Sequence, residues 1–207
     1  RRLQIEDQQQ KFDINTFDEA TSQAMAEGLP LRWSQLRDRP EALFLLRQNK
    51  ELKDLYRRYY GTDTCQATVN AGLSWLRSQQ REDGSFLIQP ARSSSRALAS
   101  HSMAILALLA DGYHNDPVVR LAVQHLQEWV DGSGRIVIDQ DMASGDVARG
   151  MATLALVEAA LLMQDDDLKA AAQLVLDENI PAQRAAHAGL DGYFLLAMET
   201  ASVGGLS

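Results

Sequence analysis

The stretch Met103-Ala-Ile-Leu-Ala-Leu108 decides the fold, because it recurs almost unchanged as Met151-Ala-Thr-Leu-Ala-Leu156. A weaker third copy follows at Phe194-Leu-Leu-Ala-Met198. Each copy lies in a segment that is apolar on nearly all sides and rich in alanine, which is typical of a helix enclosed by other helices. Recurrence at this spacing indicates repeated helix pairs that bury their faces against one another. The three apolar segments are residues 97–110, 147–163 and 190–201.

A second kind of helix precedes each apolar segment. Residues 66–80, 118–130 and 168–177 each place apolar side chains on a single face, as an amphipathic surface helix does. We expect a break containing Gly or Asp after each of them. The alternation predicts an all-α fold, a partial α/α toroid of about three helix pairs with the apolar helices inside and the amphipathic helices outside.

The first part of the chain differs from the repeats in composition, because it contains a glutamine run, many charged residues and two prolines. Helices are expected at 16–28 and from Pro40 to a turn at Gly61. We therefore predict an N-terminal helical extension over residues 1–62 and a repeat domain over residues 63–207.

Composition excludes several classes of function. The 207 residues carry a net charge of -8, and the acidic balance makes nucleic acid an improbable partner. Cys65 is the single cysteine, so neither an intramolecular disulfide nor a Cys-only metal site is available. The longest apolar run, residues 103–110, is too short to span a membrane, so no membrane span is expected. The cellular compartment stays undecided.

Residues 71–86, which read AGLSWLRSQQREDGSF, resemble the Gln-x-x-Asp-Gly-Ser-aromatic element of the prenyltransferase and squalene-oxidase-type repeat family. Residues 144–160 are similar to the inner-helix repeat of a bacterial branch of that family, known from planctomycete-type proteins of uncharacterised function. Residues 189–198 resemble the next inner helix. The resemblance covers residues 63–206 and implies an α/α toroid, the scaffold of terpene cyclases, prenyltransferase β subunits and thioester domains. Those proteins normally use more helix pairs.

The Asp-Gly element has a structural task that the residues themselves explain. Gly84 can adopt a positive φ where a helix ends, Asp83 can bind exposed backbone amides, and Phe86 can pack back onto the domain. The second copy, residues 131–135, keeps the turn chemistry but loses the glutamine and the aromatic residue. The third amphipathic helix lacks the element.

The chemical groups of the resembled enzymes are missing. The chain has no Asp-x-Asp-Asp acid, and Cys65 with Asp63 stands at the edge of the domain rather than at a central zinc site. No cofactor is therefore expected, and the missing motifs favour a protein that is not an enzyme. Asp139 and Asp141 lie in a loop between repeats, as a cation or substrate contact or as ordinary loop residues. Asp165, Asp166 and Asp167 are predicted to form a solvated turn and helix N-cap.

One set of polar residues is predicted to converge. His101, Arg149 and Asp191 take equivalent places near the N-terminal ends of the three apolar helices, which run parallel in a toroid. They would form a pocket for a small anion or polar ligand, with Arg149 as charge partner and Asp191 orienting His101. In the other interpretation each residue caps or neutralises its own helix, with Arg149 and Asp191 ion-paired. The residues expected to line the same pocket are Ser100, Asp146 and Tyr193.

Two functions follow from this pattern. The first is a non-catalytic or catalytically degenerate module that binds a protein partner or a small polar or anionic ligand at its concave mouth. The alternative is a terpene-cyclase-like or polysaccharide-lyase-like enzyme, with His101 as acid, Arg149 as charge neutraliser, Tyr193 as base and Asp191 as orienter. An arc of three pairs also leaves a lateral face that residues 1–62 or a second copy must cover, which predicts homo-oligomerisation.

Overall fold

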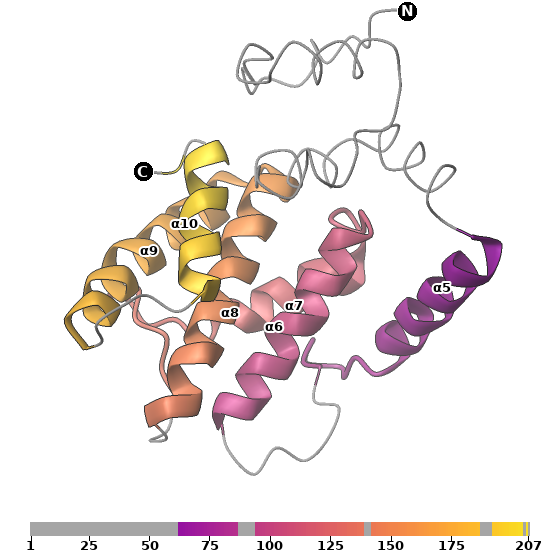
Figure 1. Ribbon diagram of the computed structural model, residues 1–207, viewed down its shortest axis with the longest axis horizontal. Helices are drawn as coiled ribbons and strands as arrows, with labels where there is room; N and C mark the ends of the chain where they lie inside the picture. The colour runs from indigo at the N-terminus through magenta and orange to yellow at the C-terminus, as the bar shows by residue number, and fades with distance from the viewer. Residues whose placement is uncertain (1–61, 87–93, 139–141, 187–191, 205, 207) are drawn as a thin grey trace, which may run out of the picture. The chain divides into compact units, whose positions relative to one another are not determined.

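The computed structural model describes residues 62–86, 94–138, 142–186, 192–204 and 206 (Figure 1). Over these ranges the regular elements are all helices, and the β-type pairing is one isolated antiparallel bridge between Val130 and Ile136. The predicted all-α class is confirmed. The chain divides into two compact units, residues 1–68 and 69–207. The helices expected at 16–28 and 40–61 lie outside the described residues, and the domain boundary expected after residue 62 stays a prediction.

The six helices of the described part correspond to the six predicted from the pattern. Three are the amphipathic helices and three are the apolar ones, in strict alternation along the chain. Their bounds are α5 Asp63–Ser78, α6 Ser94–Ala110, α7 Pro117–Gln127, α8 Met142–Met163, α9 Asp166–Ala186 and α10 Gly192–Gly204.

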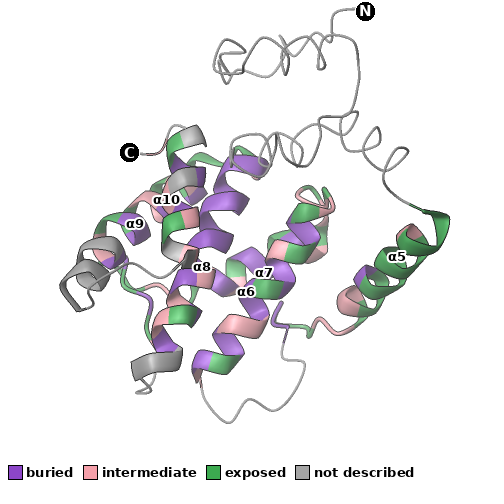
Figure 2. Ribbon diagram, in the orientation of Figure 1, coloured by how far each residue is buried: buried purple, intermediate pink, exposed green. Residues whose placement is uncertain are grey.

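The core lies around α8, which packs against α6, α7, α9 and α10. Every side chain from Ala152 to Leu162 is buried, as expected for a helix that is apolar on all sides. In Figure 1 the apolar helices α6, α8 and α10 run in the same direction, with α8 in the middle. Figure 2 shows the contrast with α5, of which most residues are exposed. Leu73 is the buried residue of α5.

The amphipathic helices begin with the same kind of cap. The carboxylate of Asp116 accepts a hydrogen bond from Val118 N at the start of α7, where Pro117 takes the first helical position. Asp165 accepts from Leu168 N at 3.0 Å at the start of α9, which confirms its predicted capping role. These caps satisfy backbone donors that have no partner within the helix, and so they fix where each helix begins. At the start of α5 the corresponding cap is the hydroxyl of Thr62.

Several predicted helix bounds are wrong. The helix α8 begins at Met142 and not at residue 147, and α10 ends at Gly204 and not at residue 201. The break expected at Asp177 does not occur, because α9 continues to Ala186 and Asp177 accepts a hydrogen bond from Gln173 on the same helix. In contrast, α7 ends at Gln127 and not at residue 130. The chain turns there so that Val130 can pair with Ile136 across the next turn. Local helical periodicity does not register such a tertiary pairing.

No helix of the described residues is long and apolar enough to cross a membrane.

Candidate functional site

A tight turn at residues 81–86 connects α5 to the rest of the domain. Arg81 N donates to Ser85 O at 3.0 Å, and Gly84 N donates to Arg81 O at 2.9 Å. Gly84 has φ 87°, a conformation that L side chains rarely adopt, and a Cβ built on it would lie 2.6 Å from Leu121 O on α7. Glycine is therefore required here twice, for its backbone conformation and for the close approach of α7.

The second turn, residues 131–136, repeats this geometry. Asp131 N donates to Arg135 O at 2.9 Å, and Gly134 N donates to Asp131 O at 2.9 Å. Gly134 has φ 89°, and a Cβ on it would overlap the backbone carbonyl of Leu174 on α9. The hydrogen bonds thus make Gly134 the equivalent of Gly84.

This equivalence corrects the sequence alignment of the two turns. Matching the Asp-Gly pairs would place Gly132 on Gly84, but a Cβ on Gly132 meets no atom within 4 Å. With the register set by Gly134, the residue equivalent to Phe86 is Ile136, and the two are 0% and 1% exposed. The aromatic residue is therefore replaced by another large buried side chain, and the packing function of that position is retained.

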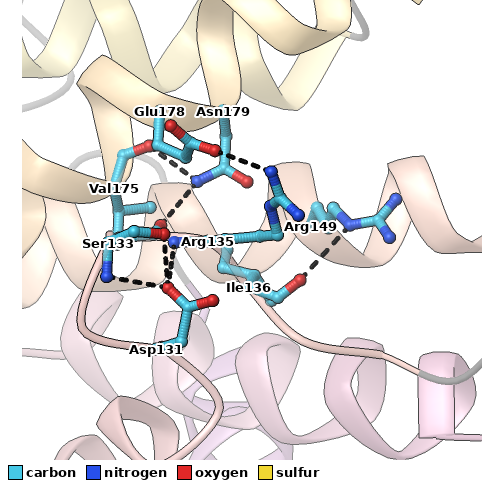
Figure 3. Close-up of polar contacts among 9 residues, drawn as sticks. Asp131, Ser133, Arg135, Ile136, Arg149, Val175, Glu178 and Asn179 are labelled. Atoms are coloured by element: carbon cyan, nitrogen blue, oxygen red, sulfur yellow. Dashed lines mark hydrogen bonds and ion pairs between the residues drawn. The ribbon is translucent and has the colours of Figure 1, made fainter.

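A side-chain amide secures each turn to the next amphipathic helix. Gln80 Nε2 donates to Gly84 O at 3.1 Å and to Val118 O at 2.7 Å. In the second turn Asn179 Nδ2 donates to Gly134 O at 2.9 Å and to Val175 O at 2.7 Å (Figure 3). Both partners are carbonyl oxygens in each case, so only the nitrogen of the amide fits. The missing glutamine is visible in the sequence, but no local pattern marks Asn179 as the residue that replaces it.

His101 on α6 anchors the first turn. Its Nδ1 accepts a hydrogen bond from Phe86 N at 3.1 Å, and its Nε2 lies 2.9 Å from Ala122 O on α7. The ring is 1% exposed and meets the ring of His125 edge to face. Burial lowers the pKa of His101 to about 4, against the opposing effect of the bond to Ala122 O. The ring is therefore neutral at pH 7, with its proton on Nε2.

Arg149 on α8 takes the same place in the second turn. Its Nε donates to Ile136 O at 3.4 Å (Figure 3), and its Nη1 donates to Asp146 Oδ1 at 3.0 Å. A Cβ on Gly145 would lie 2.9 Å from Ile138 Cδ1, so this glycine makes room for the Ile138 side chain, while the guanidinium of Arg149 lies at ordinary contact distance, 3.5 Å from that Cβ to Nη1. His101 and Arg149 thus have equivalent roles, since each ties the buried residue after a turn to the neighbouring apolar helix.

The remaining predicted site residues are only partly placed. Asp191, Asp139 and Asp141 lie outside the described residues, so the convergence of Asp191 with His101 and Arg149 stays a prediction. Ser100 donates its hydroxyl to carbonyls within α6, at 2.8 Å for Arg96 O. Tyr193 is half-buried on α10. The ion pair that the structure shows for Arg149 is with Asp146, on the same helix.

The described ranges contain no candidate metal site. These residues include no group of three or more His, Cys, Asp or Glu side chains arranged to hold a metal ion. Cys65 is an exposed free thiol in the first turn of α5, apart from any such group.

Comparison of the chain with models of protein families, with curated proteins and with solved structures found no match.

Proposed function

We propose that the helix pairs form part of an α/α toroid and that the chain is a binding module, not an enzyme. The module takes an anionic group, a carboxylate or phosphate, of a small ligand or a protein partner at the end where the apolar helices begin. The shared direction of α6, α8 and α10 and the repeated turn geometry support the toroid. The proposal includes kinship with the prenyltransferase and squalene-oxidase-type repeats, supported by the turn that the Asp83-Gly84 element forms.

The guanidinium of Arg149 is the observation that carries the proposal. Its Nε and Nη1 hold Ile136 O and Asp146, while Nη2 makes no hydrogen bond to any described residue. The side chain as a whole is 31% exposed, so part of it is open to an anion from solvent. Figure 3 shows the guanidinium extending past the Ile136 carbonyl. Because the side chain is already fixed by two bonds, an incoming carboxylate or phosphate meets a donor whose conformation is prepared.

The alternative of catalysis has less support. An acid catalyst must present a proton to substrate, yet both ring nitrogens of His101 are bound to backbone groups and the ring is buried. Its low pKa also leaves it almost fully unprotonated at pH 7. The arrangement suits a scaffold whose polar residues hold turns in place.

We expect anions to stabilise the protein through Arg149. Thermal unfolding would be measured with phosphate, sulfate, citrate and a short acidic peptide, for the full chain and for Arg149→Gln. At a ligand concentration of about 100 times Kd the stabilisation is about 2.7 kcal/mol, which corresponds to a rise in Tm of about 5 to 10 °C at this size. The variant should lose this rise.

Arg120→Gln is the matched control, because it removes the same charge from an exposed position on α7. It should keep the full response to the anion that acts on the wild-type chain. If every anion leaves Tm unchanged, or if Arg149→Gln responds as strongly as Arg120→Gln does, the proposed anion site is wrong.

The expected self-association also stays a prediction. On α5, Val69 and Trp75 are 49% and 50% exposed, and a second copy of the chain would cover them in such a dimer. Light scattering of the full chain measures it, and a strictly monomeric mass at all concentrations would contradict it.

A further inference from the structure

The anchors of the two turns are equivalent in position but opposite in chemistry. His101 accepts a hydrogen bond from an N–H group, that of Phe86, so its function depends on an unprotonated ring nitrogen. Arg149 donates to a carbonyl, that of Ile136, and a guanidinium keeps its proton at any pH that proteins tolerate. Acid can therefore act on the first anchor while leaving the second unchanged.

We infer that the contact between His101 and the turn at residues 81–86, called the joint below, is sensitive to acid. The joint opens as the pH falls, while the turn at residues 131–136 stays closed. A proton on Nδ1 would place its N–H group against the N–H group of Phe86, and both residues are buried, so neither donor would have an acceptor. The other nitrogen is held by Ala122 O, so the ring cannot rotate to present a different acceptor without losing that bond as well. Protonation thus requires the turn to leave the ring.

The surroundings of the ring favour this response. His125 on α7 lies with its ring centroid 5.2 Å from that of His101, and its charge opposes protonation. Asp83 in the turn acts in the other direction, more weakly than burial. From α8, which packs on α6, neither Asp146 nor Arg149 nor Glu158 is among the groups that act on the ring. The closed joint therefore strongly prefers the neutral ring.

The sign of the pH effect follows from this preference. In the opened joint His101 titrates near its ordinary pKa of 6.5, whereas in the closed joint its pKa is about 4. The closed form is fully stable above pH 6.5 and loses stability as the pH falls towards 4. Two aspartates in the turns, Asp83 and Asp131, have pKa values lowered by hydrogen bonds from Ser85 and Ser133. Both remain charged throughout this window, so they do not distinguish the turns.

Opening of the joint would loosen the end of α5. Beyond the turn itself, that end is held by the ion pair of Arg77 with Asp116 at 2.6 Å and by Gln80, whose amide bridges Gly84 O and Val118 O. The Gln80 bridge requires Gly84 in its closed position, so it is lost with the turn. Mild acid would therefore expose Phe86 and weaken the attachment of α5, which Arg77 would still hold through Asp116 and the ring of Tyr113.

Hydrogen exchange of the full chain between pH 7 and pH 5 tests the inference. After correction for intrinsic rates, protection of residues 81–86 should fall about 20-fold, the population change that the two pKa values produce. Residues 131–136 should keep their protection over the same range. An equal loss of protection in both turns would indicate global unfolding and would overturn the inference. Full protection of both turns at pH 5 would overturn it as well.

His101→Asn is the matched variant, since Asn Oδ1 can accept from Phe86 N without titrating. Its first turn should exchange with no additional pH dependence relative to the second. Where this variant does not fold, the imidazole nitrogen signals of the wild-type chain decide. A neutral ring at pH 5.5 with its proton on Nε2 supports the joint, and a ring that titrates near pH 6.5 overturns it.

Discussion

Gly134→Ala is expected to destabilise the protein by about 3 kcal/mol, because two penalties add at this position. A residue with a Cβ at φ 89° is strained, by about 1 to 2 kcal/mol. The new Cβ would also overlap the backbone carbonyl of Leu174, which cannot rotate away as a side chain can. Such overpacking costs about 1 to 3 kcal/mol. Urea denaturation should show a lower midpoint with an unchanged slope.

Gly132→Ala is the control for this change. It lies in the same turn, has no positive φ, and its Cβ would meet no atom within 4 Å. We expect its free energy of unfolding to differ from that of the wild-type chain by no more than about 0.5 kcal/mol. Equal effects of the two substitutions would mean that the approach of the turn to α9 is not as described.

Asn179→Asp should destabilise the protein by about 3 kcal/mol at pH 7, because it places a carboxylate between two carbonyl oxygens. Asn179 is 5% exposed, and its nitrogen donates to Gly134 O and Val175 O. The aspartate that replaces it would have a raised pKa, and once protonated it regains one donor. The destabilisation should therefore diminish as the pH falls below that raised pKa, which denaturation at several pH values would reveal.

Gln124→Glu makes the same chemical change at an exposed position of α7. It should change the free energy of unfolding by no more than about 0.5 kcal/mol and show no comparable relief in acid. If Asn179→Asp and Gln124→Glu had the same free energy of unfolding, the Asn179 amide would not hold the turn at residues 131–136.

The sequence predicts the helices because each of them has a strong local pattern. The recurrence of Met103–Leu108 at Met151–Leu156 identifies two apolar helices. Of these, α8 is buried from Ala152 to Leu162, whereas α6 buries one side and leaves Met103 52% exposed. The same alignment puts His101 and Arg149 at equivalent positions, and their contacts with the residues after the two turns agree with it. Periodicity and repetition are local or nearly local, so one chain suffices to detect them.

The parts that the sequence did not predict depend on contacts between distant segments. The sequence identifies residues 131–135 as a second copy of the turn but does not show which of its two glycines matches Gly84, whereas contact with Leu174 selects Gly134. Asn179 has no local signal, because its partner Gly134 lies 45 residues earlier. His101 was expected to face a ligand, but nothing in its neighbourhood along the chain indicates that Phe86 and Ala122 occupy its ring.

The origin of the amide donor limits how freely these repeats can be exchanged. The donor of the first turn, Gln80, precedes Gly84 by 4 residues and would travel with it in any contiguous segment. The donor of the second turn comes from α9, so a recombination point between α8 and α9 would separate Gly134 from Asn179. In a chimera that takes α9 and α10 from another protein, the Gly134 carbonyl would lose its donor, unless the new α9 carried an amide side chain at the position of Asn179. Shuffling of such units is therefore permitted at one boundary and penalised at the other.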